Sequence, residues 1–311
     1  MQTRSQRGVA LLTALLIVAL VATLGVGMLT HMNFALHRGG NLWLSQQALQ
    51  YARGVEAWVA QILRRDRENN DTDTLEEVWA QPVNYLPVEA GVLSGQVIDL
   101  QGRFNVNNLA RGDAQSATAG FARLLQYAAK VDPVTAQAIA QATRDWGDPD
   151  TRPTGAYGAE DAYYLGLTPA YRCANRPIVS VTALRAVRGM QPEIYRALRP
   201  YVTALPEATS INVNTASAPV LASLAKDLDP QTIEQLLKIR KDDPWNSVDA
   251  FLREDALAGR KLERDQISVA SDWFLAQGQV ALGRIKLRFY SLLHRGTRGQ
   301  TIIVRHGRNA F

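Results

Sequence analysis

Residues 4–29, RSQRGVALLTALLIVALVATLGVGML, decide the architecture of this 311-residue chain. Arg4 and Arg7 are followed by residues 9–29, among which no side chain is charged. At 1.5 Å per residue, a helix of this length covers about 30 Å, the thickness of the hydrocarbon core of a bilayer. Because lipid offers no partner to backbone N–H groups, we predict a transmembrane helix over this run. The basic flank predicts a cytoplasmic N-terminus, with the bulk of the chain outside.

Three interpretations of this segment compete. A secretory signal has a shorter apolar run and a small-residue cleavage site after it, and the nearest candidate here, at residues 33–35, is poor. A plain membrane anchor explains the length but gives no role to Gly8, which joins the basic leader to the apolar run. A prepilin-type signal does: cleavage between Gly8 and Val9 removes leader residues 1–8 and leaves the helix intact. We favour the third interpretation.

Charge and cysteine content restrict the class of protein. The net charge of +5 comes mostly from the C-terminal end, because no acidic residue follows Asp272. A nucleic-acid interface would therefore rest on that tail. Apolar and basic residues alternate with period two over residues 284–289, so we expect the basic residues of the tail, Arg295 included, on the solvated face of a hairpin. The single Cys173 excludes an intrachain disulfide framework.

The helix is predicted to continue beyond the membrane, over residues 30–65. Leu44, Ala48, Tyr51, Val55, Trp58 and Ile62 recur at intervals of three and four, which is one face of an amphipathic helix. We expect this stripe to pack on a globular body. The polar stretch DRENNDTDT at residues 66–74 predicts a loop at its end.

The remaining pattern is strand, long helical block, strands. Residues 93–100 predict a strand within a segment, 66–103, that we interpret as a loop and first strand. Helical patterns fill residues 104–265, several opened by proline, and we divide this block into halves at about 104–204 and 205–265. The predicted helices are residues 119–131, 133–145, 181–187, 192–198 and 230–241. Residues 266–311 predict the C-terminal strands. The fold class is thus α+β, a helical insertion in a small antiparallel sheet packed on the N-terminal helix.

A segment at residues 211–216, INVNTA, is similar to the opening of helix-hairpin-helix DNA-binding modules. Those modules need a glycine-bearing hairpin whose backbone N–H groups approach a phosphate. The corresponding residues 225–230, AKDLDP, contain no glycine and two carboxylates. DNA binding by this element is therefore the weaker interpretation, and we expect no nucleic-acid partner.

An acidic cluster lies in the loop sequences DWGDPD and GAED. Carboxylates at such spacing can coordinate a hard cation such as Ca²⁺, although the spacing is not that of an EF-hand. Capping of helices and pairing with nearby arginines is the alternative we favour, and catalysis is the least favoured. No Ser/His/Asp order and no phosphate-binding glycine loop occurs, so we expect no enzyme. The candidate ligands are Asp145, Asp148, Asp150, Glu160 and Asp161.

Taken together, these segments resemble the K-class minor pseudopilins of type II secretion systems. The resemblance covers nearly the whole chain and several independent motifs in the right order: RGVALLTALLIVALVATL at the start, residues 93–109, 145–150, 158–177 and 211–224, and SDWFLAQGQVALGR with SLLHR near the end. It implies a pilin-like helix and sheet with a large helical insertion of SAM-like, helix-hairpin-helix-like type. It also implies cleavage after Gly8 by prepilin peptidase, with N-methylation of Val9, and makes Ca²⁺ in the globular part plausible.

The chain departs from the general pilin pattern at one position. Most pilins carry Glu at the fifth residue of the mature chain, where it is thought to meet the N-terminal amine of a neighbouring subunit; counted from Val9, that position is Thr13. A carboxylate or an amine in lipid is costly unless it is paired. A subunit without the acid offers no partner to a subunit added above it, which fits a place at the tip.

We therefore expect a non-catalytic minor pseudopilin that initiates and caps the periplasmic pseudopilus, through which folded proteins leave across the outer membrane. The resemblance implies the I- and J-class minor pseudopilins, other pseudopilins, the inner-membrane secretion platform and prepilin peptidase as partners. The location implied is the inner membrane, single-pass. Two rivals remain: a membrane-anchored DNA-uptake protein that uses INVNTA and the basic tail, and a membrane-tethered hydrolase that uses Asp148 and Glu160.

Overall fold

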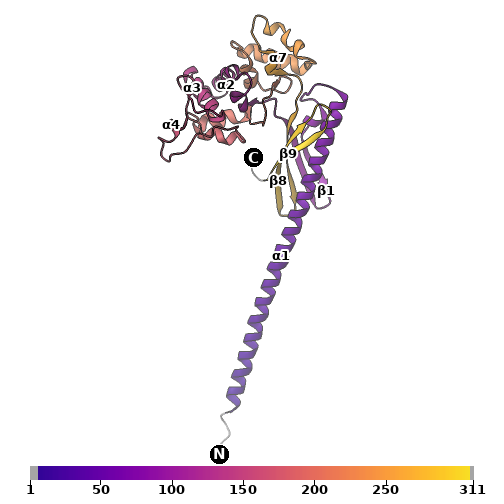
Figure 1. The fold of residues 1–311 in the computed structure, drawn as a ribbon. Helices are drawn as coiled ribbons and strands as arrows, with labels where there is room; N and C mark the ends of the chain where they lie inside the picture. Colours follow the sequence, from indigo (N-terminus) through magenta and orange to yellow (C-terminus); the bar gives the residue numbers. More distant parts are fainter. Residues whose placement is uncertain (1–5, 309–311) are drawn as a thin grey trace, which may run out of the picture.

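The computed structural model describes residues 6–308, with side chains from Val9 onward, as a long helix, a sheet and a helical insert (Figure 1). Helix α1, Gln6–Asn69, is 64 residues long, so it ends at Asn69 rather than at residue 65. Most of the predicted leader, residues 1–5, and the last residues, 309–311, lie outside the described residues.

The sheet has five antiparallel strands in the order β1-β2-β7-β8-β9. Residues 66–103 contain two of these strands, so the prediction of a single first strand there was wrong. The extra strand, β1, precedes the predicted strand and pairs with it after a short turn. The sequence of β1 contains a proline and polar residues, so its pattern did not indicate a strand. The strands are β1 Val83–Val88, β2 Gly91–Asp99, β7 Trp273–Leu282, β8 Ile285–Arg295 and β9 Thr301–Arg308.

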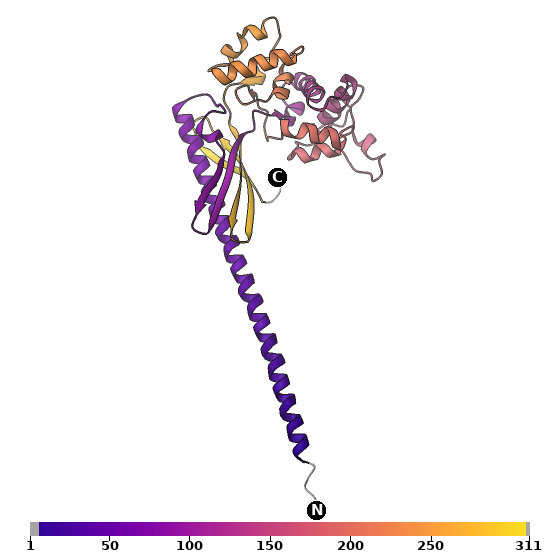
Figure 2. The ribbon, with the colours of Figure 1, turned by 180° about the vertical axis from the view of Figure 1, so that it is seen from behind.

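The second half of α1 packs lengthwise on this sheet (Figures 1 and 2). Its buried line runs through Ala48, Ala52, Val59 and Leu63, which contact strands β7 and β8. Trp58, predicted within the packed stripe, is instead 48% exposed. The small side chains of Ala48 and Ala52 let the helix approach the sheet closely, so the buried face is centred on them and not on Trp58.

The basic alternation in β8 is confirmed for Lys286 and Arg288, which are exposed. Arg295 at the end of the same strand is not: it is 1% exposed and its guanidinium pairs with Asp66 and Asp73. The prediction of a solvated Arg295 was wrong because its partners lie more than 200 residues away in the sequence. A buried guanidinium is stable only when its charge is compensated.

The helical insert leaves the sheet after β2 and returns at β7, two strands that are neighbours in the sheet. Aspartates at positions 113, 132 and 229 cap three of its helices by accepting backbone N–H groups, and prolines at 133 and 230 start two of them. Its α-helices are α2 Ala114–Ala129, α3 Pro133–Gly147, α4 Asp161–Tyr164, α5 Pro192–Leu198, α6 Ala218–Leu224, α7 Pro230–Asp242 and α8 Val248–Leu252.

Short segments complete the insert. Residues predicted as a helix at 181–187 form a 3₁₀ helix, Val181–Ala186. Two parallel strand pairs bring distant segments together: β3 Phe104–Asn105 pairs with β4 Val202–Thr203, and β5 Ile211–Asn212 with β6 Ile267–Ser268. These pairs close two successive loops of chain, residues 104–203 and 211–268. The α+β class, with a helical insertion in an antiparallel sheet on a long helix, is confirmed.

A buried polar junction joins the insert to the sheet. The carboxylate of Asp99, at the end of β2, accepts hydrogen bonds from Thr215 Oγ1 (2.5 Å), Ser271 Oγ (2.7 Å) and Asn212 Nδ2 (3.0 Å). Asn212 Nδ2 also lies 3.0 Å from the carbonyl oxygen of Asp73. Since each of these groups is satisfied by another segment, the junction fixes the insert in one orientation on the sheet. The insert lies at the end of the sheet that is remote from the N-terminus of α1 (Figure 2).

Candidate functional site

The first half of α1 has no partner among the described residues. Its side chains from Val9 to residue 43 are exposed, although residues 9–29 are almost wholly apolar. Only this described helix is long and apolar enough to cross a membrane. The Thr13 hydroxyl donates to the carbonyl oxygens of Val9 (3.1 Å) and Ala10 (2.9 Å), so its hydrogen bond is made within its own helix. Gly8 and Val9 both lie within α1, so the predicted scissile bond falls in its first turn.

Three of the five predicted carboxylates converge. Asp148 follows directly on α3, Asp150 lies in the next loop, and Glu160 precedes α4; one oxygen from each lies within 4.8 Å of the others. Glu160 is 3% exposed, and neither of its carboxylate oxygens has a hydrogen-bond partner. Asp148 is 7% exposed, and its Oδ1 is likewise without a partner. Buried carboxylate oxygens without partners are costly, which makes this cluster a candidate cation site.

The other two predicted ligands support the loops instead. Asp145 accepts the backbone N–H groups of Thr154 (3.0 Å) and Ala159 (2.6 Å), so both of its oxygens are used. Asp161 Oδ1 accepts the backbone N–H of Cys173 at 2.8 Å. The structure therefore divides the predicted cluster into three converging acids and two that fold the loop around them.

The pKa values of the buried acids, Asp148 and Glu160, are raised, as expected for carboxylates with little compensating positive charge nearby. Burial raises the pKa of Asp148 to about 7, and repulsion from Asp150, Asp145 and Glu160 adds to this effect. Burial also raises the pKa of Glu160. The nearest guanidinium nitrogen, Arg144 Nε, lies 4.0 Å from Asp148 Oδ2, too far for a hydrogen bond. Hard divalent cations such as Ca²⁺ bind such oxygen sets, and the residues present fit one.

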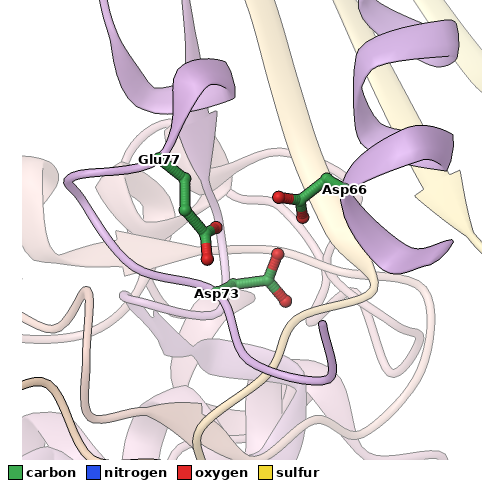
Figure 3. Close-up of side chains that lie close together, drawn as sticks. All are labelled: Asp66, Asp73 and Glu77. Atoms are coloured by element: carbon green, nitrogen blue, oxygen red, sulfur yellow. The ribbon is translucent and has the colours of Figure 1, made fainter. Parts of the chain in front are cut away.

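A second group of carboxylates was not predicted from the sequence. Asp66, Asp73 and Glu77 also bring one oxygen each within 4.8 Å of one another (Figure 3). Arg295, which is buried, pairs with Asp66 and Asp73. The stretch DRENNDTDT indicated only a polar loop. The residue that could have indicated this group is Arg295, because its guanidinium pairs with two of the acids. Nothing in the sequence predicts that Arg295 lies beside that loop.

Comparisons with known proteins decide the family. Models described as type II secretion system protein K match residues 102–207 and 211–270. Proteins named type II secretion system protein K are similar over nearly the whole chain: that of Pseudomonas aeruginosa is 35% identical, with 96% of this chain and 91% of the relative covered, and that of Klebsiella pneumoniae is 34% identical, with 96% of each covered. This chain belongs to the type II secretion protein K family.

A solved structure agrees with this assignment. The K subunit in the crystal structure of the GspK–GspI–GspJ complex from enterotoxigenic Escherichia coli superposes with a TM-score of 0.75, at 25% identity, over 88% of this chain and 100% of that one. In a member of the K family, the long apolar helix fits a single-pass membrane anchor. The two family models meet between residues 207 and 211, close to the middle of the insert.

The helix-hairpin-helix resemblance of this K-family member has a structural basis in α6, the following turn and α7. The turn contains Asp227 at a φ of +67°. Asp229 caps α7 by accepting the N–H of Thr232 at 2.9 Å, and it pairs with Arg260 at 3.2 Å. The carboxylates thus occupy the turn where a DNA phosphate would have to approach, and they would repel it.

Proposed function

We propose that this chain is the minor pseudopilin that starts and caps the tip of the pseudopilus in its type II secretion system. Helix α1 anchors it in the inner membrane with the N-terminus in the cytoplasm. The sheet and the insert lie in the periplasm. Membership of the K family and the unpartnered apolar half of α1 support this proposal.

The observation that carries the tip role is the position of the insert. It lies at the end of the molecule opposite the N-terminus of α1 (Figure 1), where the next subunit of a filament would have to stack. Thr13 adds to this argument, because its hydroxyl is bonded within its own helix and no carboxylate is available to an amine above it. A subunit that can be joined only from below ends a filament.

The partners proposed are the I- and J-class minor pseudopilins, as in the complex of the related K subunit. The test is co-expression of the full chain with its own I- and J-class subunits, followed by purification through a tag on one of them. We expect a complex that contains one copy of this chain, and we expect cysteine cross-links between copies of this chain to fail. Filaments with stacked copies of this chain would contradict the tip role.

Processing is proposed to occur between Gly8 and Val9, by prepilin peptidase, with methylation of the new N-terminus. Intact-mass measurement of the protein from cells with and without the peptidase tests this step. The expected mature chain begins at Val9 and stays in the membrane. A mature chain free in the periplasm, starting beyond residue 29, would contradict both the cleavage and the anchor.

We further propose that Asp148, Asp150 and Glu160 bind Ca²⁺, with a structural and not a catalytic role. Two buried acids with oxygens that lack partners support this site. Calcium titration of the EDTA-stripped full chain should show a binding component that Asp148→Asn and Glu160→Gln each remove. Glu234→Gln, which removes an exposed charge on α7, is the matched control. Equal binding by all three variants would remove the site.

The alternatives make different predictions. A DNA-uptake protein would bind DNA with an affinity that falls steeply as the salt concentration rises, because binding releases counterions from the DNA. We expect no such binding, since Asp227 and Asp229 lie in the hairpin. A hydrolase would lose an activity in the Asp148→Asn variant while it still assembled with its partners. We expect the reverse, that substitutions in the acidic cluster impair assembly without loss of any chemical activity.

A further inference from the structure

We propose that Asp66, Asp73 and Glu77 form a second site for a divalent cation of the Ca²⁺ type, independent of the proposed tip role. The three side chains come from the last turn of α1, from the loop after it and from the residue before the 3₁₀ helix Val78–Ala80. They point toward one another (Figure 3), and one oxygen from each lies within 4.8 Å of the others.

The hydrogen bonds of the three acids leave one side of the cluster open. Asp66 Oδ2 accepts from Arg295 Nη1 at 2.9 Å. Asp73 Oδ2 accepts from Arg295 Nη2 (2.5 Å) and from the N–H of Ser271 (2.7 Å). Glu77 Oε2 accepts from Trp79 Nε1 at 2.6 Å. Each acid is therefore oriented through one oxygen by donors from elsewhere in the protein.

The unused oxygen of Asp73 is the second, separate indication of a ligand. Asp73 is 0% exposed, and within residues 6–308 no hydrogen bond reaches its Oδ1. The carboxylate of Asp73 also supplies one of the three converging oxygens. A fully buried carboxylate oxygen without a donor costs about 1–3 kcal/mol or more, so folded proteins rarely leave one uncompensated. A cation at the centre of the group satisfies it.

The net charge of the site is one that a divalent ion would neutralise. Three carboxylates and one guanidinium, that of Arg295, leave two negative charges in a largely buried region. Burial raises the pKa of Asp73 to about 7, although the charge of Arg295 lowers it, and burial also raises the pKa of Glu77. Ca²⁺ takes six to eight oxygen ligands at about 2.3–2.6 Å, and waters complete what the three carboxylates begin.

An ion there would connect three parts of the molecule. Asp66 belongs to α1, and Arg295 ends β8. The backbone of Asp73 donates to the carbonyl of Val269 (2.9 Å) and accepts from Asn212 Nδ2 (3.0 Å), both in the segments that lead into the insert and out of it. Binding would thus stiffen the attachment of α1 and of the insert to the sheet.

Terbium luminescence can test the site, because Tb³⁺ substitutes for Ca²⁺ and is sensitised by a nearby indole. Trp79 bonds to Glu77, whereas Trp146 in α3 lies beside the other acidic cluster. We would titrate Tb³⁺ into the full-length, EDTA-stripped chain in detergent. The expected signal has two components. Glu77→Gln and Asp66→Asn each weaken one of them at least about tenfold. Asp148→Asn weakens only the other.

The control is Glu76→Gln, which removes an exposed charge from the neighbouring position outside the cluster. Thermal melts in EDTA and in Ca²⁺ separate binding from folding. In EDTA, the melting temperature of Glu77→Gln should be no lower than that of wild type, because the substitution relieves repulsion between the acids. Ca²⁺ should raise the melting temperature of Glu77→Gln by less than it raises that of wild type. The proposal is overturned if Glu77→Gln and Glu76→Gln bind alike, or if Glu77→Gln melts lower in EDTA and gains as much from Ca²⁺ as wild type.

Discussion

At the scale of single residues, Cys173 shows how a reactive group becomes inert by position. The side chain is 9% exposed and contacts the carbonyl oxygen of Asp145 at 3.5 Å. Burial raises the pKa of its thiol from 9.0 to about 12. Only the thiolate attacks alkylating reagents. Its burial therefore makes Cys173 a structural residue rather than a reactive thiol.

We predict that Cys173 resists alkylation in the native protein. At pH 8 the thiolate fraction should be about a thousandfold lower than for an ordinary cysteine, and burial slows the reaction further. Iodoacetamide labelling followed by mass spectrometry should show no modification in buffer and complete modification in denaturant. Labelling at equal rates in both conditions would contradict the buried position.

Arg295 illustrates the opposite case, a charge that folding places inside the protein. We predict that Arg295→Met destabilises the protein by about 3–5 kcal/mol in EDTA, because Asp66 and Asp73 lose the charge that compensates them. Chemical unfolding measures the change. The control Arg298→Met, in the exposed turn before β9, should shift stability by less than about 0.5 kcal/mol. Equal effects would mean that the buried pairs do not stabilise the fold.

At the scale of elements, α1 is one helix in two environments. Leu63 in its second half is 0% exposed against the sheet, whereas Leu42, before the sheet begins, is 57% exposed. We predict that Leu63→Ala destabilises the globular part by about 2–5 kcal/mol through lost contacts and a cavity. Leu42→Ala should leave the unfolding transition unchanged, since that side chain has no described neighbour to lose. Denaturation followed by tryptophan fluorescence in detergent compares the two variants.

The elements also show which patterns are visible in a sequence. Helices α3, α5 and α7 were predicted to within a few residues, because a proline at the first turn and, in α3 and α7, an aspartate cap mark their starts locally. Strand β1 was missed, since its order depends on pairing with β2 rather than on alternation of its own. The period of α1 was recognised, but it does not identify the most buried face, and Trp58 was misplaced.

The candidate sites divide in the same way. Asp148, Asp150 and Glu160 lie within a short stretch of sequence, so their proximity could be inferred. Which of five acids converge depends on the backbone donors that Asp145 and Asp161 meet, and these are set by the folded loop. The cluster around Asp73 could not be predicted, because its compensating charge comes from the opposite end of the chain.

At the scale of the whole molecule, hydrogen bonds to Asp99 join the insert to the sheet. We predict that Asp99→Ala, which removes the buried carboxylate that accepts from Thr215, Ser271 and Asn212, lowers stability by about 1–3 kcal/mol for each donor that is left without a partner. We expect calorimetry to show one unfolding transition for wild type and two for the variant. A single transition at unchanged temperature would show that the junction does not couple the two parts.

The tip role makes a last prediction, at Thr13. If no subunit lies above this chain, a carboxylate at this position has no amine to meet, and an unpaired charge in the bilayer costs about 2.5–3.5 kcal/mol or more. We therefore expect Thr13→Glu to reduce membrane insertion, recovery with the I- and J-class subunits, and secretion. Thr13→Ala should do none of this, since the Thr13 hydroxyl bonds only to carbonyls of its own helix. Full function of Thr13→Glu, with copies of the chain cross-linking along a filament, would place a subunit above this one and end the argument for a cap.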